Sequence, residues 1–382
     1  LSWLLRILRG ASGQVVLGHA GRKVGRQNTI AAAAGPPLFI FPCTMSLPLS
    51  RHIMPRLLTS PMASVTMNSA RRRLGPWHSI SRTFTAGDKA GILRVSEDDK
   101  NEQVLGSSEG PIWHHASSIK GMRRSMEDRF DVLAPKLDDS ALSYFAVFDG
   151  HAGSDCAEFL SKVLIDSCSS EPDALMADPE AFLKARFLDL DDRYCEYASS
   201  LSKHDGSTAV LAVVEREPST ACPYALWVAS TGDSRALVVR KSGKVKQLTR
   251  DHSPSEPDER KRVEDDGGFV KFVTNPFFSS GEGTLRVNGV LAMTRAFGNY
   301  SMKPFVTAEP EVVKRKIRKD DLYLCLATDG LSETVTDDEI GQYLLRYGAY
   351  KGVEKLANLA LERGSSDNIT VLAAQLNLNI MC

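Results

Sequence analysis

The fold is decided by a segment that runs YFAVFDGHAG, residues 144–153. Three of its first five residues are aromatic and one is β-branched, and a glycine closes the run, which is typical of a buried strand. The strand leads into Asp149, so a carboxylate stands at its tip where the chain must turn. Asp-Gly is also a common turn dipeptide, so an ordinary turn explains this segment equally well when it is taken alone.

Charge is unevenly distributed along the 382 residues, although the formal net charge is zero. Residues 1–87 contain 11 Lys or Arg and no acid, which leaves 36 basic against 47 acidic residues after them, a net charge of −11. This leader is also rich in Ser, Ala and Leu, as organelle transit peptides are, and we expect it to direct the protein to the mitochondrial matrix. A basic nucleic-acid-binding arm and a cytoplasmic location are the alternatives. Residues 88–109 are expected to form a linker.

The seven cysteines are scattered and form no CxxC pair. Their pattern argues against a disulfide framework or a cysteine zinc site and favours a reducing compartment. No apolar run reaches membrane-spanning length, so we expect no membrane span. The acidic body fits poorly with nucleic-acid binding.

Strands and helices alternate in pairs along the body, which favours an α+β layered sandwich over a doubly wound sheet. The polar segment TGDSR, residues 231–235, stands between two strand-like runs and indicates a hairpin. Residues 269–289 are expected to form an irregular surface flap. We expect helices at 155–167, 179–200, 255–266, 337–346 and 351–363, and strands at 206–214, 224–230, 236–240, 322–327 and 369–376.

Three acids border buried strands. Asp149 and Asp329 each close an apolar run, and Asp367 lies just before another, so strands paired in one sheet can bring these acids together. Two carboxylates ~4 Å apart repel by about 4 kcal/mol at an effective dielectric near 20, so converging acids need protonation or a cation. Oxygen ligands suit Mg²⁺ or Mn²⁺. The acids of the other two Asp-Gly pairs, Asp205 and Asp266, are expected to mark plain turns.

Nine motifs follow one another between residues 110 and 376, and together they resemble the metal-dependent serine/threonine protein phosphatases of type 2C. The motifs are GMRRSMEDRF, YFAVFDGHAG, GSTA, TGDSRA, DHSP, the glycine pair at 267–268, RVNGVLAMTRAFGN, ATDG and SSDNITV. The resemblance implies a catalytic domain over 110–376, a short tail over 377–382 and an α-β-β-α sandwich. In that sandwich two antiparallel sheets lie between helices, with a binuclear metal site at one end.

By motif, the resemblance implies a set of metal ligands for two Mg²⁺ or Mn²⁺ ions. Asp149 would bridge both ions and the carbonyl group of Gly150 would bind one. The remaining ligands are Glu127 for one ion, and Asp329 and Asp367 for the other. 

A weaker third ion is also implied. Asp233 in TGDSR, with Glu333 near it, resembles the ligands of such an ion, although Glu333 stands where the family often has Asp. An ordinary hairpin turn is the other explanation for Asp233.

The resemblance also implies roles for residues that do not bind metal. Asp128 would orient the attacking water, Arg123 would hold the substrate phosphate, and His151 would protonate the leaving oxygen as general acid. The alternatives are a surface ion pair between Arg123 and Glu127, and a helix-capping role for His151. Asn299 stands where the family commonly has Asp, and we infer no loss of activity from it.

The function implied is hydrolysis of phosphoserine and phosphothreonine in proteins by direct attack of water, without a phosphoenzyme. The basic leader before this domain further resembles the mitochondrial type that acts on the branched-chain 2-oxo acid dehydrogenase complex. A pseudo-phosphatase that binds phosphoproteins is the runner-up, and every core ligand motif is present against it. A nuclease with the same metal chemistry fits the acidic body poorly.

Overall fold

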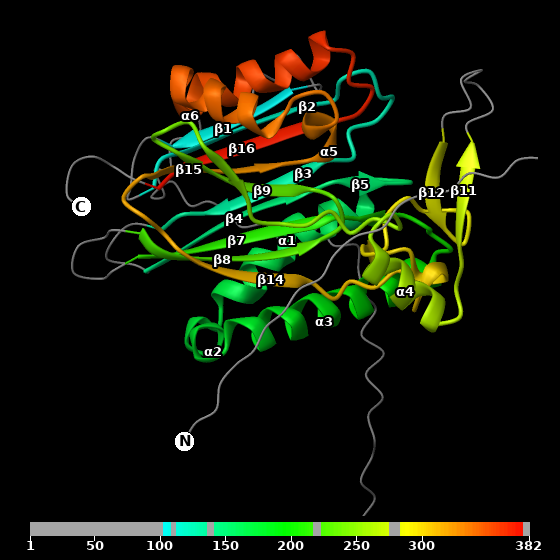
Figure 1. Ribbon diagram of the computed structural model, residues 1–382. Helices are drawn as coiled ribbons and strands as arrows, with labels where there is room; N and C mark the ends of the chain where they lie inside the picture. The colour runs from blue at the N-terminus through cyan, green and yellow to red at the C-terminus, as the bar shows by residue number, and fades with distance from the viewer. Residues whose placement is uncertain (1–101, 108–111, 136–140, 217–222, 275–282, 377–382) are drawn as a thin grey trace, which may run out of the picture. The chain divides into compact units, whose positions relative to one another are not determined.

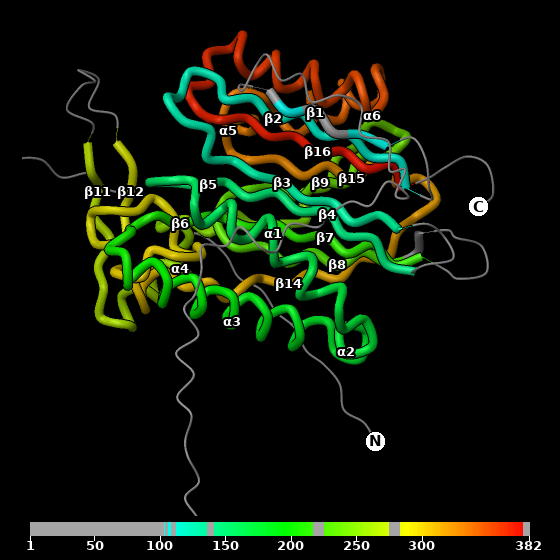
Figure 2. The backbone as a smooth tube through the Cα atoms, turned by 180° about the vertical axis from the view of Figure 1, so that it is seen from behind, coloured from blue at the N-terminus to red at the C-terminus, as the bar shows by residue number. Residues whose placement is uncertain are grey.

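Two antiparallel sheets lie face to face, with helices on both outer faces (Figures 1 and 2). The computed structural model describes residues 102–107, 112–135, 141–216, 223–274 and 283–376. Within them the first sheet has the strand order β1-β2-β16-β15-β9-β10, and the second has the order β14-β8-β7-β4-β3. The α+β sandwich predicted from the sequence is confirmed.

The elements have the following bounds. The first sheet consists of β1 (Glu102–Ser107), β2 (His114–Ile119), β16 (Ile369–Gln375), β15 (Asp321–Ala327), β9 (Arg235–Arg240) and β10 (Val245–Gln247). The second consists of β14 (Glu311–Lys316), β8 (Pro223–Thr231), β7 (Ala209–Arg216), β4 (Leu142–Phe148) and β3 (Arg129–Leu133). Two smaller sheets comprise β5 (Gly150–His151), β6 (Gly206–Ser207) and β13 (Phe297–Gly298), and β11 (Val270–Thr274) and β12 (Gly283–Val287). The helices are α1 (Asp155–Ser169), α2 (Pro172–Ala177), α3 (Pro179–Ser200), α4 (Pro257–Asp265), α5 (Asp329–Ser332), α6 (Asp337–Glu362) and the 3₁₀-helix η1 (Tyr300–Met302).

Strand β4 is apolar without alternation because both of its faces are buried. Tyr144, Ala146 and Phe148 belong to the core between the second sheet and helices α1 and α3. Phe145 and Val147 belong to the core between the two sheets. Full burial of a large apolar side chain is worth about 1.5–3 kcal/mol, and this run forms an inner strand of the second sheet, between β7 and β3.

Helix α6 covers the outer face of the first sheet (Figure 1). Its start is fixed by a capping box in which Thr336 accepts from the backbone N–H of Glu339 and the Glu339 side chain accepts from Thr336. At Gly348 the backbone leaves the helical region, with φ +73°. The two helices predicted here are therefore confirmed, and they meet at a glycine that tolerates this backbone conformation.

Two segments predicted as irregular contain strands. β1 lies within the segment 88–109 expected to be a linker, and it pairs with β2 over its whole length. An edge strand bonds to one neighbour only and needs few apolar residues, so the pattern gave no strand signal. The expected flap at 269–289 contains the antiparallel pair β11–β12. The hydrogen bonds between β11 and β12 join backbone groups, so this pair can form without an alternation of apolar residues.

The expected hairpin at residues 231–235 is wrong. β8 pairs with β7 and β14 in the second sheet, whereas β9 pairs with β15 and β10 in the first. The chain therefore crosses from one sheet to the other at TGDSR. Strand alternation is the same before a crossover and before a hairpin, so the sequence pattern does not distinguish the two.

The expected leader, 1–87, and the tail, 377–382, lie outside the described residues. Among the residues that are described, no helix has the length and apolar character needed to cross a membrane.

Candidate active site

The acids predicted to meet come from both sheets rather than from one. Asp149 follows β4 of the second sheet, whereas Asp329 follows β15 and Asp367 precedes β16 in the first sheet. β15 and β16 are antiparallel neighbours, so the end of one lies beside the start of the other. The sandwich then places all three acids at the same end of the two layers. Our expectation of a single sheet is corrected, because the site lies across the layers.

The close approach of the segment after β15 to the segment before β16 depends on a glycine. An added Cβ at Gly330 would overlap the carbonyl oxygen of Asn368 and lie 3.3 Å from the Cβ of Asp367. Gly330 therefore allows the backbone after Asp329 to approach the backbone before β16. The glycine of the ATDG motif has a packing role as well as a turn role.

Asp149 is the centre of a buried group of negative charges. Burial raises its pKa well above the usual value, and the charges of Asp329, Asp128 and Asp233 raise it further. Burial also raises the pKa of Asp128 and of Asp233, each to about 7. These mutual effects show that the carboxylates share one region, where like charges oppose one another's ionisation.

Asp128 is held by two hydroxyl groups that the sequence did not single out. Its side chain is buried, and its Oδ2 atom accepts hydrogen bonds from Thr328 Oγ1 at 2.9 Å and from Thr370 Oγ1 at 2.7 Å. Thr328 directly follows β15 and Thr370 lies in β16, so each is close in sequence to an acid of the ATDG or SSDN motif. These bonds orient the Asp128 carboxylate across the layers. Their adjacency to the two acids is the signal that could have identified them.

Glu127 is fixed on the opposite side of the chain from Asp128. Its backbone N–H donates to Asn368 Oδ1 at 2.8 Å. Its carboxylate accepts from Ser125 Oγ at 2.6 Å and from the backbone N–H of Gly153 at 3.1 Å. Neighbouring side chains of an extended segment point to opposite faces, and the different partners of Glu127 and Asp128 agree with this.

Arg123 pairs with Asp367 and not with Glu127, the surface partner considered from the sequence. Its Nη2 atom lies 2.5 Å from Asp367 Oδ2, and its Nε donates to the Ser366 carbonyl at 3.1 Å. Arg123 is about half exposed, with 53% of its side chain accessible, so its guanidinium group faces solvent at the rim of the acids. A planar cation in that place can meet an incoming oxyanion.

His151 is oriented by Asn299. The Nδ2 group of Asn299 donates to the His204 carbonyl at 3.0 Å, which leaves its Oδ1 facing His151 Nε2 at 2.8 Å. We therefore assign the hydrogen of the imidazole ring to Nε2. In the described part of the chain, Nδ1 is buried without a hydrogen-bond partner. Burial lowers the pKa of His151, while the bond to Asn299 opposes this shift.

Asp205, predicted as a plain turn, supports this same region. It is buried, and its Oδ2 atom accepts from Tyr194 Oη at 2.6 Å and from the backbone N–H of Cys156 at 2.9 Å. Its carbonyl oxygen accepts from the backbone N–H of Asn299. Its polar neighbours in sequence gave no sign of burial, because the partners come from distant segments.

Asp233 lies at the crossover between β8 and β9, beside the other acids. Burial is the largest cause of its raised pKa, and the charges of Asp329 and Glu333 raise the pKa further. Burial and then the charges of Asp329 and Asp367 raise the pKa of Glu333. Asp233 and Glu333 therefore lie near each other, as the motif comparison implied, and Asp233 is not a hairpin residue.

The carboxylate oxygens of this site are the type of ligand that a hard divalent cation prefers, although their spacing is not that of a formed metal site. Within the described ranges, no three histidine, cysteine, aspartate or glutamate side chains stand at metal-holding spacing. The pKa shifts place the carboxylates near one another, and Asp233 Oδ1 and Asp329 Oδ1 are buried without partners among those residues. Rotation about side-chain bonds can bring carboxylates that already lie close together to coordinating distance. Buried oxygen donors of this charge suit Mg²⁺ or Mn²⁺.

Comparison with known proteins agrees with this geometry. A family model described as "Protein phosphatase 2C" matches residues 113–369. "Probable protein phosphatase 2C 7" of Oryza sativa subsp. japonica is 34% identical over 331 residues, which cover 80% of this chain and 83% of that protein. "Probable protein phosphatase 2C member 13, mitochondrial" of the same organism is 40% identical over 260 residues, covering 68% and 67% respectively.

Solved structures show the same fold. A structure titled "Structure of a C.elegans sex determining protein" superimposes with a TM-score of 0.61 at 29% identity, covering 72% of this chain and 66% of that one. A structure of a phosphatase from a pathogenic strain of Toxoplasma gondii superimposes with a TM-score of 0.59 at 24% identity, covering 71% and 94%.

Proposed function

The chain belongs to the protein phosphatase 2C family, hydrolases that act on phosphoserine and phosphothreonine in proteins, and on that premise we propose how its own residues do so. The observation that carries the proposal is the meeting of Asp149, Asp329 and Asp128 at the end of both sheets. Such a group is stable in ionised form only with a counter-cation.

We assign Glu127, Asp149, Asp329 and Asp367, with the carbonyl group of Gly150, to two Mg²⁺ or Mn²⁺ ions. Asp233, with Glu333, is assigned to a weaker third ion; burial and the neighbouring Asp329 support this assignment. When bound, divalent cations would neutralise the carboxylates, polarise the phosphoryl group and lower the pKa of the attacking water.

The remaining residues orient the reactants. We assign Asp128 to accept a hydrogen bond from the attacking water and to direct its lone pair at phosphorus; the hydrogen bonds from Thr328 and Thr370 that hold its carboxylate support this assignment. Arg123 is assigned to the substrate phosphate, for which it would exchange its contact with Asp367. Attack by water is direct, so the P–O bond to the serine or threonine breaks in the same step and no phosphoenzyme forms.

His151 is assigned as the general acid. The ring acts in its doubly protonated form: Nε2–H stays bonded to Asn299, and the proton that is transferred leaves from Nδ1. The leaving serine or threonine oxygen takes that proton, which avoids expulsion of a strongly basic alkoxide.

A first experiment tests the class of reaction. The full chain, stripped with EDTA and supplied with Mn²⁺, is expected to release phosphate from a phosphoserine peptide, and Asp149→Asn to abolish turnover while the circular dichroism spectrum stays unchanged. Activity that persists in EDTA, or near-normal turnover by Asp149→Asn, would overturn the metal assignment. A folded wild type that binds the peptide and never hydrolyses it would favour a phosphoprotein-binding pseudo-phosphatase.

We further propose that the protein acts on mitochondrial phosphoproteins, with the branched-chain 2-oxo acid dehydrogenase complex as the first candidate. The basic, acid-free composition of residues 1–87 supports this, and one relative carries "mitochondrial" in its name. A fluorescent protein fused behind residues 45–87 is expected to enter mitochondria; a cytoplasmic signal would favour the cytoplasmic alternative. Comparing phosphoproteins of isolated mitochondria with and without active enzyme identifies the substrate.

A further inference from the structure

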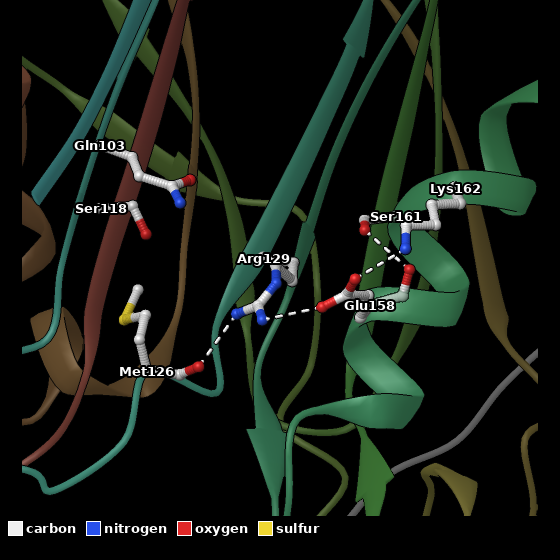
Figure 3. Close-up of a pocket in the computed structure, with 7 residues that line it drawn as sticks. All are labelled: Gln103, Ser118, Met126, Arg129, Glu158, Ser161 and Lys162. Carbon is white, nitrogen blue, oxygen red and sulfur yellow. Dashed lines mark hydrogen bonds and ion pairs between the residues drawn. The ribbon is translucent and has the colours of Figure 1, made fainter. Parts of the chain in front are cut away.

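A cleft lies beside the candidate active site, between the edge of the first sheet and helix α1 (Figure 3). Its volume is about 390 Å³, within the range of small-ligand pockets. Gln103 of β1 and Ser118 of β2 lie on one side, and Ser161 of α1 lies on the other. Met126 and Arg129 also line the cleft, so it reaches the segment that carries Glu127 and Asp128.

The charged groups in this cleft carry a surplus positive charge. Arg129 Nη2 lies 3.1 Å from Glu158 Oε2, and Lys162 Nζ lies 2.6 Å from Glu158 Oε1. Two cations therefore share one carboxylate. The hydrogen bonds found among the described residues use three of the five N–H groups of Arg129, so it retains donors for an added oxyanion.

Arg129 connects the cleft to the backbone of Asp128. Its Nη1 group donates to the carbonyl oxygens of Asp128 at 2.8 Å and of Met126 at 3.0 Å. The same guanidinium group thus faces the cleft with Nη2 and holds the 126–128 segment with Nη1 (Figure 3). A ligand that moves this side chain must alter the support of Asp128.

A second connection reaches the carboxylate of Asp128. Thr370 Oγ1 donates to Asp128 Oδ2 at 2.7 Å, so its oxygen must accept from Ser118 Oγ, which lies 2.7 Å away. Ser118 itself lines the cleft. The cleft is therefore linked to both the backbone and the side chain of Asp128 by short chains of hydrogen bonds.

We infer that this cleft is a regulatory site for a small oxyanion, a phosphate or a carboxylate, whose binding between Arg129 and Lys162 lowers the rate of the phosphatase. An anion bound to the remaining donors of Arg129 and to Lys162 draws the guanidinium group away from the Asp128 and Met126 carbonyl groups, which loosens the residue that orients the attacking water. Affinity for the substrate phosphate depends on Arg123, which does not line the cleft. The inference about rate rests on the proposed function, whereas anion binding does not.

Binding is tested on the full chain by isothermal titration calorimetry. Inorganic phosphate and succinate serve as separate probes, because the reaction product and a metabolic carboxylate are the two sources of such an anion. Lys162→Ala removes one cation and is expected to weaken binding about fivefold. Lys184→Ala is the matched control, since Lys184 likewise pairs with the glutamate four residues before it but does not line the cleft. Equal affinities in all three proteins, or no binding of either anion, would overturn the site.

Kinetics then separate the cleft from the active site. An anion in the cleft is expected to reduce kcat with KM unchanged, whereas phosphate that competes at Arg123 raises KM. Without an added anion, Lys162→Ala should have the same kcat as the wild type. An added anion should no longer lower the kcat of this variant. Any effect of phosphate on KM should persist. Binding that disappears in Lys162→Ala but never alters kcat would refute regulation. If the chain proved to be no enzyme, calorimetry would still report on the site.

Discussion

Asn299 fixes the ring of His151: its side-chain oxygen lies 2.8 Å from His151 Nε2, and its amide nitrogen is held by the His204 carbonyl. Asn299 itself has φ +49°, a left-handed conformation that asparagine tolerates well. The position commonly occupied by Asp in the family therefore retains an acceptor for the histidine. The acceptor is neutral, so it orients the ring without adding a negative charge beside it.

Asn299→Ala is expected to lower kcat about tenfold on a phosphoserine peptide, because an unoriented His151 donates its proton poorly. The loss should be small on p-nitrophenyl phosphate, whose leaving group needs little protonation. Steady-state kinetics with both substrates measure the difference. Asn299→Asp keeps an acceptor and should retain activity on both. An equal loss on the two substrates would mean that Asn299 has only a structural role.

Gly206→Ala is expected to act through the same contact. An added Cβ would overlap Asn299 Oδ1 and lie 2.6 Å from the Phe297 carbonyl oxygen, so the Asn299 side chain must move. The selective loss on the phosphoserine peptide should reappear. Combined with Asn299→Ala, the second substitution should add little, which a double-mutant cycle measures. Additive losses would show that the two residues act independently.

The metal-free protein is expected to lose stability as the pH rises from about 4 to above 7. Burial raises the folded-state pKa of Asp128 and Asp233 to about 7, from 3.8. The folded state then binds more protons than the unfolded state in this window, so raising the pH favours unfolding. Melting curves in EDTA at pH 6 and pH 8 measure this. Added Mn²⁺ should stabilise the protein more at pH 8 than at pH 6. It should stabilise Asp149→Asn less than the wild type.

Glu259 is expected to stabilise the protein above about pH 4.5 and to lose that contribution towards pH 2. Burial opposes its ionisation, but hydrogen bonds from Arg295 and Thr294 outweigh this and lower its pKa to about 2. The contribution is on the order of 3 kcal/mol. Glu259→Gln should therefore be destabilised at pH 7, with the difference shrinking in acid unfolding experiments. An equal difference at pH 7 and pH 3 would contradict the charge argument.

The pattern of apolar residues predicted the layers of this fold, because each buried strand shows as an apolar run in its own stretch of sequence. The continuous apolar run before Asp149 indicated a strand with two buried faces, and the spacing in 179–200 matched helix α3 in full. The hairpin at Asp233 was wrong because the same alternation precedes a turn and a crossover. Which sheet a strand joins depends on partners far away in the chain.

The acids of the site were identified from the sequence motifs, but the residues that hold these acids by hydrogen bonds were not. Thr370 and Asp128 are 242 positions apart in the chain, and no local pattern joins them. Asp205 was predicted to lie in a turn because its neighbours in sequence are polar. Its hydrogen-bond partners Tyr194 and Cys156 are distant in the sequence and contact it only in the folded chain. Residues that orient catalytic groups are thus found by tracing the partners of each acid in the structure.

The place of β16 in the first sheet has a consequence for synthesis. This strand, near residue 375, lies between β2 and β15, and Asp367 and Thr370 enter the site with it. A growing chain cannot close the first sheet until this strand has left the ribosome. A nascent chain is therefore catalytically silent until β16 has been synthesised and inserted between β2 and β15.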